Sequence, residues 1–274
     1  MIISRLAPTP SGYLHLGNAL NFVLTFLHVK AQEGILKLRI DDFDAARCRR
    51  EYVDDIFKTV DWLELPIDDG PLSSDDFFKH YSQKLKYNYY KEQMYAMQAE
   101  GATLYTCSCS RKKLQNYKRY PGFCRNSTQT LQRGHNAMRI AVKEESLAQS
   151  MGDFILWRRD NIPAYQLVSL IEDRDAGVNL IVRGKDLFQS SQAQRYLAQF
   201  AHAKTFENAR FIHHELITRN DGSKFSKSDH DYALHVRRNE ATKQKLFTKA
   251  AQLCNIPPQE SLKGLLHTFK AVSL

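Results

Sequence analysis

The first forty residues restrict the possible folds of this chain more than any other segment. An apolar run at 2–7 predicts a strand, periodic apolar residues at 19–34 predict a helix, and 36–40 predicts a second strand. A strand, a helix and a strand joined by short links form a parallel pair with a right-handed crossover. We therefore expect an α/β fold built on a doubly wound parallel sheet.

The remaining segments extend this pattern with one interruption. Helices are expected at 49–65, 77–100, 164–172 and 190–203, and strands at 137–142, 154–158, 179–182 and 211–218. Residues 101–136 are basic and rich in turn residues, which indicates an insertion. We expect four parts: the first half of the sheet domain at 1–100, the insertion at 101–136, the second half at 137–231, and a basic helical segment at 232–274.

Charge and hydropathy narrow the function classes. Among 274 residues, 39 Lys and Arg against 30 Asp and Glu leave a net charge of +9, which favours an anionic partner such as nucleic acid or a polyphosphate. A solvated basic surface explains this excess equally well. No apolar stretch approaches the roughly 20 residues of a membrane span, and the N-terminus does not resemble a signal peptide, so we expect a cytoplasmic protein that binds no membrane.

The loop PTPSGYLHLGN at 8–18 joins the first strand to the first helix. Backbone N–H groups at such a helix start attract phosphate, and Gly12 and Gly17 allow the backbone to come close to it. The side chains of His15 and Asn18 stand where they could hydrogen-bond phosphate oxygens. The alternative interpretation is that His15 is a local cap of the helix.

A second loop, GSKFSKSD at 222–229, follows the last expected strand. Lys224 and Lys227 are separated by two residues and interleaved with serines, so they can close over a polyphosphate and neutralise charge that develops during transfer. Taken alone, this loop is more readily interpreted as a solvated basic loop.

Three of the five cysteines fall close together in the insertion. Cys107, Cys109 and Cys124 supply three thiolates, one short of the usual tetrahedral zinc set, so their spacing leaves zinc and buried or free thiols both open. Cys48 and Cys254 stand alone and are interpreted as packing residues.

Taken together and in this order, the two loops resemble the signature motifs of class I aminoacyl-tRNA synthetases. HLGN is similar to the HIGH motif, KFSKS is similar to KMSKS, and RLAPTPSGYLHLG resembles the start of the glutamyl subgroup. LRIDDFD at 38–44, AYQL at 164–167, IVRGKDL at 181–187, CSC and YPGFC extend the resemblance from Arg5 to about Asp229. The family implies a Rossmann-type catalytic domain split by a small zinc-containing insertion.

The resemblance implies an amino-acid pocket at the matching positions, which are Arg5, Ala7, Thr9, Asp41, Tyr165 and Arg183. Arg5 matches the arginine that pairs with the substrate side-chain carboxylate, and such a pair can be bidentate. Without the resemblance, Tyr165 is open to interpretation as a half-buried helix residue and Arg183 as a surface salt bridge.

Several positions depart from the family pattern. Asp41 stands where bacterial glutamyl enzymes have Glu and glutaminyl enzymes have Asp, opposite the substrate α-amino group. The shorter side chain moves the carboxylate back by one methylene, about 1.3–1.5 Å. Asn18, Phe43 and Phe225 also differ, and Thr9 replaces a Ser.

The resemblance also implies ligands for ATP and zinc. ATP would be bound by His15, Gly17, Asn18, Lys224 and Lys227, with Mg²⁺ on its phosphates, and His15, Lys224 and Lys227 would be the catalytic residues. A structural zinc ion would be held by Cys107, Cys109, Tyr120 and Cys124, since Tyr120 matches an unusual tyrosine ligand in the spacing Cys-x-Cys…Tyr-x3-Cys.

The best match is a short branch of the family that lacks the anticodon-binding domain, because the sequence ends 45 positions after Asp229. Members of that branch activate glutamate with ATP and attach it to the queuosine base in the tRNA(Asp) anticodon loop. We expect a monomer whose basic residues at 111–125 and in the tail contact RNA. The alternatives are a related ligase that uses glutamate or glutamine with another tRNA or a non-tRNA acceptor, and a non-catalytic RNA-binding module.

Overall fold

Two parallel strand pairs and one antiparallel sheet form the framework of the chain in the computed structural model, which describes residues 1–216 and 234–273. The chain is divided into two compact units. Unit 1 comprises 1–85, 178–187 and 209–274, and unit 2 comprises 86–177 and 188–208. Among the described residues, no helix combines the length and the apolar character that crossing a bilayer requires.

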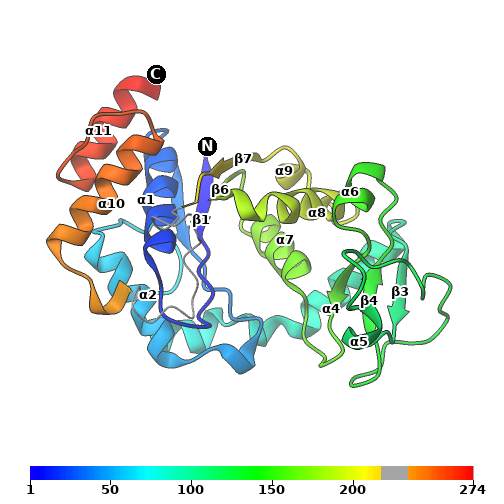
Figure 1. Ribbon diagram of the computed structural model, residues 1–274. Coiled ribbons are helices and arrows are strands. Elements are labelled where there is room, and N and C mark those ends of the chain that lie inside the picture. Colours follow the sequence, from blue (N-terminus) through cyan, green and yellow to red (C-terminus); the bar gives the residue numbers. More distant parts are fainter. Residues whose placement is uncertain (217–233, 274) are drawn as a thin grey trace. The chain divides into compact units, whose positions relative to one another are not determined.

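Unit 1 contains the two parallel strand pairs and the helices that pack beside them (Figure 1). Its strands and α-helices are β1 (Ile3–Leu6), α1 (Leu16–Lys30), β2 (Ile35–Leu38), α2 (Arg50–Trp62), α3 (Ser74–Asp76), β6 (Leu180–Gly184), β7 (Arg210–His214), α10 (Glu240–Leu253) and α11 (Leu262–Ser273). Short helical turns of other types lie at Ala45–Arg47, Phe77–Tyr81, Gln83–Lys86, Lys185–Leu187 and Leu234–Val236.

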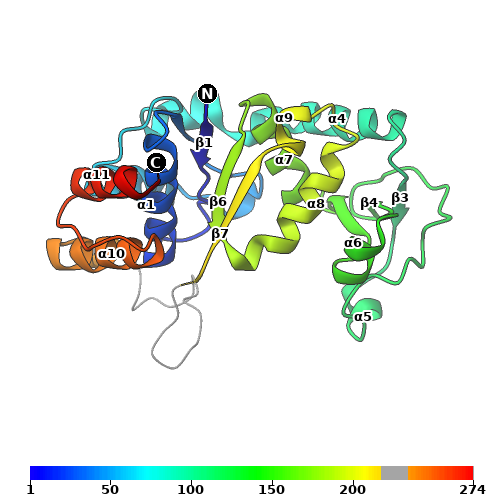
Figure 2. The ribbon, with the colours of Figure 1, turned by 90° about the horizontal axis from the view of Figure 1, so that it is seen from above.

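The parallel pairs confirm the expected strand–helix–strand unit. β1 pairs with β2 in parallel, and β6 pairs with β7 in parallel. Asn179 joins the two pairs, because its backbone N–H donates to the Ile3 carbonyl at 3.0 Å and its side-chain oxygen accepts from the Ile3 N–H at 2.8 Å. Figure 2 shows β6 and β7 side by side.

A large apolar core stabilises unit 1. Helix α1 lies against α10 and α11 (Figures 1 and 2), and its buried face belongs to a cluster that runs from β1 to the C-terminal helices. Leu20 of α1, Phe247 of α10 and Leu265 of α11 are nearly or completely buried in it. The basic segment expected from 232 therefore contributes apolar side chains to the core of unit 1, in addition to its charged side chains.

Two helices differ from the sequence expectation, the first for a local reason and the second for a tertiary one. Helix α1 begins at Leu16 rather than at 19, because His15 caps it, and it ends at Lys30, where the chain turns through Glu33 with a positive φ of 54°. The helix expected at 77–100 is broken at Ser82, whose backbone is extended. There the Ser82 hydroxyl and the Gln83 N–H both donate to the Asp42 carboxylate, so tertiary hydrogen bonds replace helical ones.

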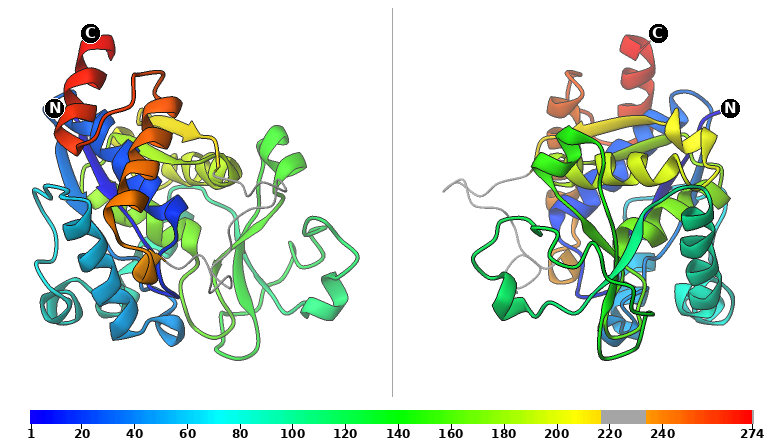
Figure 3. Two further views of the ribbon diagram at one scale, coloured as in Figure 1. Left: turned by 60° about the vertical axis from the view of Figure 1, so that its left-hand side comes forward. Right: turned by 90° about the vertical axis from the view of Figure 1, so that its right-hand side faces the viewer.

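Unit 2 is built around a three-stranded antiparallel sheet in the order β3–β4–β5 (Figure 3, green strands). Its strands and α-helices are α4 (Tyr87–Ala99), β3 (Leu104–Cys107), α5 (Arg111–Leu114), β4 (Ala137–Ile140), α6 (Glu145–Ser150), β5 (Phe154–Trp157), α7 (Tyr165–Asp175), α8 (Phe188–Ala198) and α9 (Lys204–Glu207).

The antiparallel sheet is a finding that the sequence pattern did not anticipate. The strands expected at 137–142 and 154–158 exist as β4 and β5, but β4 pairs with β3 and β5 pairs with β4 in an antiparallel sheet, rather than extending the parallel sheet. The compact unit that carries the cysteine cluster is therefore larger than the expected insertion at 101–136. The division into four segments stays a prediction.

Candidate active site and metal centre

The loop at 8–18 is shaped by a reciprocal cap at the start of α1. Nδ1 of His15 accepts a hydrogen bond from the Gly17 N–H at 3.1 Å, and Oδ1 of Asn18 accepts from the His15 N–H at 3.1 Å. A Cβ at Gly17 would lie 3.0 Å from the His15 ring, so glycine permits this close approach. The structure thus shows that His15 caps the helix, and its backbone carbonyl also accepts from the Asn18 N–H at 2.9 Å and the Ala19 N–H at 3.3 Å.

A buried ion pair between Asp55 and Arg238 fixes the same loop. One carboxylate oxygen of Asp55, on α2, accepts the Leu14 N–H at 3.0 Å, and the other accepts from Arg238 Nη1 at 2.8 Å. The side chains of Asp55 and Arg238 are only 2% and 15% exposed. Arg238 also donates to the Thr59 hydroxyl at 3.0 Å, so α2, the loop and the segment before α10 are tied together.

The lysine loop lies outside the described residues, and so do Lys224 and Lys227. The residues on both sides of 217–233 contact α1 or its loop. Before that segment, Nε2 of His214 lies 3.1 Å from Oδ1 of Asn21 on α1. After it, the Leu234 N–H donates to the Leu14 carbonyl at 2.8 Å, and the His235 ring stacks on Tyr13 at 3.7 Å between centroids.

Two arginines expected in the amino-acid pocket are buried in unit 1. Arg5 on β1 is 5% exposed, and Arg183 on β6 is 4% exposed, with its guanidinium 5.4 Å from the centre of the Phe211 ring. Buried guanidinium groups are rare unless they serve an anion or an ion pair. Ala7 and Thr9 follow β1 directly and are partly exposed, at the strand end where ligands of parallel sheets bind.

Asp41 follows β2 and is held by two side chains. Arg39 makes a bidentate pair with it, at 2.6 Å from Nε and 3.1 Å from Nη2, and Gln83 donates to the same carboxylate at 2.9 Å. The Asp41 N–H donates to the Pro8 carbonyl at 2.8 Å, so Asp41 lies beside the loop that carries Thr9. Next to it, burial raises the pKa of Asp42, although hydrogen bonds from Ser82 and Gln83 oppose that rise.

Tyr165 is the one expected pocket residue that belongs to unit 2. It is the first residue of α7, is half-buried and follows the cap residue Ala164, whose backbone is extended. The expectation of a helix at 164–172 is confirmed by α7, and Tyr165 projects from its first turn.

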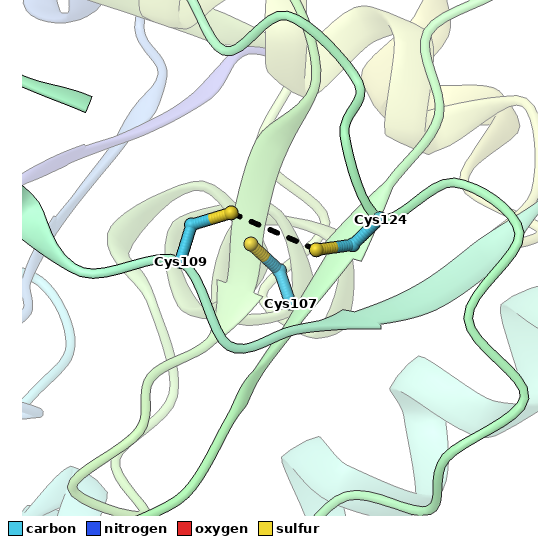
Figure 4. Close-up of side chains that lie close together, drawn as sticks. All are labelled: Cys107, Cys109 and Cys124. Carbon is cyan, nitrogen blue, oxygen red and sulfur yellow. Dashed lines mark hydrogen bonds between the residues drawn. The ribbon is translucent and has the colours of Figure 1, made fainter. Parts of the chain in front are cut away.

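The three clustered cysteines converge in unit 2 (Figure 4). Their Sγ atoms all lie within 4.8 Å of one another, and those of Cys109 and Cys124 are 3.6 Å apart. Cys107 ends β3 and is buried, while Cys109 and Cys124 lie on loops and are half-buried. The other two cysteines pack against the core of unit 1, and burial raises the pKa of each thiol to about 11, which suits inert packing residues.

Tyr120 completes the cluster with an oxygen atom. Its Oη lies 3.3 Å from Sγ of Cys107 and 3.8 Å from Sγ of Cys109, and it accepts a hydrogen bond from the Cys124 N–H at 2.9 Å. A regular tetrahedron around zinc has S···S edges of about 3.8 Å and S···O edges of about 3.5 Å. The four donor atoms therefore already lie near the corners that a zinc ion requires.

The thiols of this cluster influence one another strongly. Burial raises the pKa of Cys107, but hydrogen bonds from Tyr120, from the Cys109 backbone and from Arg139 outweigh it and lower that pKa to about 7. Burial is also the largest cause of the raised pKa values of Cys109 and Tyr120. Three sulfur donors and one oxygen donor that lie this close together form a donor set that zinc can bind, so the residues fit a zinc ion.

Sequence reasoning missed the residues that hold these side chains in place. Asp55, Arg238 and Gln83 are 40 or more positions away from the groups they bind, and no motif marks them. Arg39 was also missed, but a local signal could have found it. It precedes Asp41 by two positions, and side chains with this spacing lie on one face of an extended chain.

A model of the family described as tRNA synthetases class I (E and Q), catalytic domain, matches residues 1–261. The chain belongs to this family. Membership confirms the expected class I α/β catalytic fold and makes the chain an ATP-dependent ligase of the aminoacyl-tRNA synthetase type.

Individual members of the class I (E and Q) family resemble the chain over most of its length. It is 34% identical over 241 residues to a glutamyl-Q tRNA(Asp) synthetase of Pseudomonas putida (strain W619), covering 82% of this chain and 77% of that one. It is 32% identical over 253 residues to a glutamate–tRNA ligase of Vesicomyosocius okutanii subsp. Calyptogena okutanii, covering 83% of this chain and 51% of that one. The chain thus spans about half of the latter relative.

A solved structure shows the same family fold. The glutamate-tRNA synthetase of Elizabethkingia anophelis superposes on 98% of this chain with a TM-score of 0.71, and the match covers 66% of that longer protein. At 17% sequence identity, this likeness concerns the fold alone.

Proposed function

We propose that the protein activates glutamate with ATP and transfers it to the queuosine base of tRNA(Asp). The observation that carries the proposal is the membership in the class I (E and Q) family, together with 34% identity to a relative named glutamyl-Q tRNA(Asp) synthetase. The contacts of His214 and Leu234 support it, because these two residues flank the lysine-containing stretch of the sequence and contact α1 and the HLGN loop, respectively.

In the first step, the glutamate carboxylate attacks the α-phosphate of ATP in line and pyrophosphate leaves. No covalent nucleophile on the protein is needed, so positioning and electrostatic stabilisation supply the catalysis. His15, Gly17, Asn18 and the start of α1 would bind phosphate, while Lys224 and Lys227 would stabilise the charge on the leaving group. Magnesium bound to ATP would neutralise part of the phosphate charge.

Recognition of glutamate is assigned to the buried arginines and their neighbours. Arg5 would pair with the side-chain carboxylate, while Ala7, Thr9 and Arg183 of unit 1 would line the same pocket, and the role of Tyr165 is carried over from the family pattern alone. Asp41 would face the α-amino group. Its bidentate pair with Arg39 restrains the carboxylate, which gives the shorter Asp a defined position in place of the longer Glu.

The metal centre has a structural role in this proposal. Cys107, Cys109, Tyr120 and Cys124 would hold one zinc ion, and four protein ligands leave no open coordination position for catalysis. The ion would fix the loops on either side of β3. Metal analysis of the purified protein, with one zinc per chain expected, tests this assignment.

The acceptor in the second step is a hydroxyl group of an RNA. The net charge of +9 and the exposed basic residues at 111–119 suit contact with the RNA backbone, which makes binding strongly salt-dependent. An exposed base in the anticodon loop would provide specificity. The cytoplasmic location is proposed because a protein that modifies tRNA must reach tRNA. The monomeric state is a separate prediction.

The first test is ATP–pyrophosphate exchange with Glu, Gln and Asp, each with and without tRNA. We expect exchange with Glu alone and no requirement for tRNA. The second test compares glutamate transfer to tRNA(Asp) that contains queuosine with transfer to the same tRNA lacking it, and only the first is expected to be charged. Exchange with Gln would reassign the amino acid, and equal charging of both tRNAs would refute the acceptor.

A further inference from the structure

Arg139 is a buried cation beside the metal-binding side chains that no motif of the sequence marks. It lies on β4 and is 8% exposed. In unit 2, all of whose residues the structure describes, it is the only buried Lys or Arg. Burying a guanidinium is costly unless a negative group or well-placed acceptors compensate it.

The strand register explains why Arg139 reaches the cluster. Cys107 is paired with Ala137 and Tyr105 is paired with Arg139 across the antiparallel β3–β4 ladder. Residues opposite each other, and residues two apart on a strand, share one face of a sheet. Cys107 and Arg139 therefore project from the same face, and the Tyr120 ring covers that face, with its centroid 6.3 Å from that of Tyr105.

Arg139 contacts one of the proposed metal ligands, Tyr120, and lies near two others, Cys107 and Cys109. The centre of its guanidinium lies 3.9 Å from the centre of the Tyr120 ring, and its Nη1 donates to the Asp153 carbonyl at 2.9 Å. Its Nε is buried and has no hydrogen-bond partner among the described residues. Together with Cys107 and Cys109, Arg139 lines a hollow of about 410 Å³.

The zinc-bound ligand set would carry a net negative charge that a nearby cation can compensate. Three thiolates and one phenolate around Zn²⁺ sum to roughly two net negative charges, whereas a set with neutral histidines carries fewer. Asp153 cannot supply compensation, because its own carboxylate is negative and is paired with Arg125 at 2.7 Å. The Arg139 guanidinium can compensate this negative charge, since it stacks on the Tyr120 ring and projects from the same sheet face as Cys107.

We propose that Arg139 is a positioning residue for the metal centre: its buried guanidinium compensates the charge of the thiolate and tyrosine ligands and holds the Tyr120 ring in the orientation that the metal requires. This inference rests on the zinc assignment made above. It concerns metal affinity, which is measured separately from the ligase reaction.

The test compares wild type, Arg139→Gln, Arg139→Lys and a control, Arg158→Gln. Arg158 lines the same hollow and its loss removes the same charge, but its side chain is 34% exposed and pairs with Asp160 at the surface. Zinc affinity is measured by competition with a chromophoric chelator, and the absorption spectrum of the cobalt-substituted protein reports the ligand geometry. The unfolding temperature is measured with and without metal.

We expect Arg139→Gln to weaken zinc binding by about 10–100-fold and to change the cobalt spectrum. Arg139→Lys keeps the charge but not the planar stacking, so it should restore part of the affinity, and Arg158→Gln should bind zinc as wild type does. Equal affinity of wild type and Arg139→Gln would overturn the proposal. So would an equal loss of stability in the metal-free and metal-bound forms, since that marks a purely structural role. If the wild type binds no zinc, the zinc assignment itself fails, whatever the result of the exchange assay.

Discussion

The HLGN loop of unit 1 and the cysteine cluster of unit 2 are positioned by different means. The loop rests on a continuous apolar core that includes β1, α1, α2 and the C-terminal helices, and one buried ion pair links it to α2. The cysteine cluster rests on a much smaller apolar cluster, in which only Tyr105, Cys107 and Ala141 are buried. A small core supplies little free energy, so such a site depends on ion pairs and on a metal.

The Asp153 network shows what stabilises the cysteine cluster, whose own apolar cluster is small. The Asp153 carboxylate is fully buried and accepts hydrogen bonds from Arg125, the Tyr105 hydroxyl and the Val142 N–H. Because Arg125 follows Cys124 directly, this network fixes the loop that carries a metal ligand. Around the cysteine cluster, hydrogen bonds thus take the role that apolar packing has around the HLGN loop.

The largest expected effect concerns the reaction that we assign to the signature loops. Lys227→Ala should reduce ATP–pyrophosphate exchange at least about 100-fold, because it removes the charge that stabilises the leaving group. The matched control is Lys204→Ala, which removes an exposed lysine of α9 in unit 2. Exchange at the wild-type rate in Lys227→Ala would refute the role of the lysine loop.

The second prediction tests the buried ion pair under the HLGN loop. Asp55→Ala should lower the free energy of unfolding by about 3–5 kcal/mol, since Arg238 and the Leu14 N–H lose their acceptor. Denaturant unfolding measures this change. Asp61→Ala, on the exposed side of the same helix, is the control and should have little effect. An equally small effect of Asp55→Ala would mean that the apolar core alone holds the loop.

The third prediction separates the two units directly. Removing zinc with a chelator should speed amide hydrogen exchange in β3, β4 and the loops between them, and leave β1, β2 and α1 unchanged. At a free zinc concentration 100 times the Kd, the lost stabilisation is about 2.7 kcal/mol. Mass-resolved hydrogen exchange provides the measurement. Equal acceleration in both units would show that they unfold together and that the metal does not stabilise unit 2 alone.

The smallest expected effect is an acid sensitivity of the unit 1 core. Burial, and then the charge of Arg210, lower the pKa of His28 from 6.5 to about 4, and its ring packs edge-on against Phe269 of α11 at 4.9 Å. The unfolded chain therefore binds more protons than the folded one between pH 6.5 and 4. The contribution of His28 to the free energy of unfolding is fully present above pH 6.5 and is lost as the pH falls towards 4.

The magnitude of this loss is about 1–3 kcal/mol. His28→Gln should flatten the stability profile between pH 4 and 6.5, as measured by denaturant unfolding at several pH values. An unchanged slope in the variant would assign the acid sensitivity to other groups.

Much of unit 1 could be predicted because its signals are local. The parallel pair β1–β2 follows from the apolar runs at 2–7 and 36–40, and both are confirmed. The start of α1 was placed three residues late, because the apolar periodicity begins after the cap formed by His15 and Asn18. The break at Ser82 was not predicted, since it depends on Asp42, which is 40 positions away.

The reaction family could be predicted from the HLGN loop, the KFSKS loop and the Cys-x-Cys…Tyr-x3-Cys spacing, because these are short motifs whose chemistry depends on near neighbours. By contrast, the folded structure was needed to show that Asp55 and Arg238 hold the HLGN loop and that Arg139 lies over Tyr120. These contacts join segments far apart in the chain, and such pairings arise from strand register and core packing rather than from local periodicity.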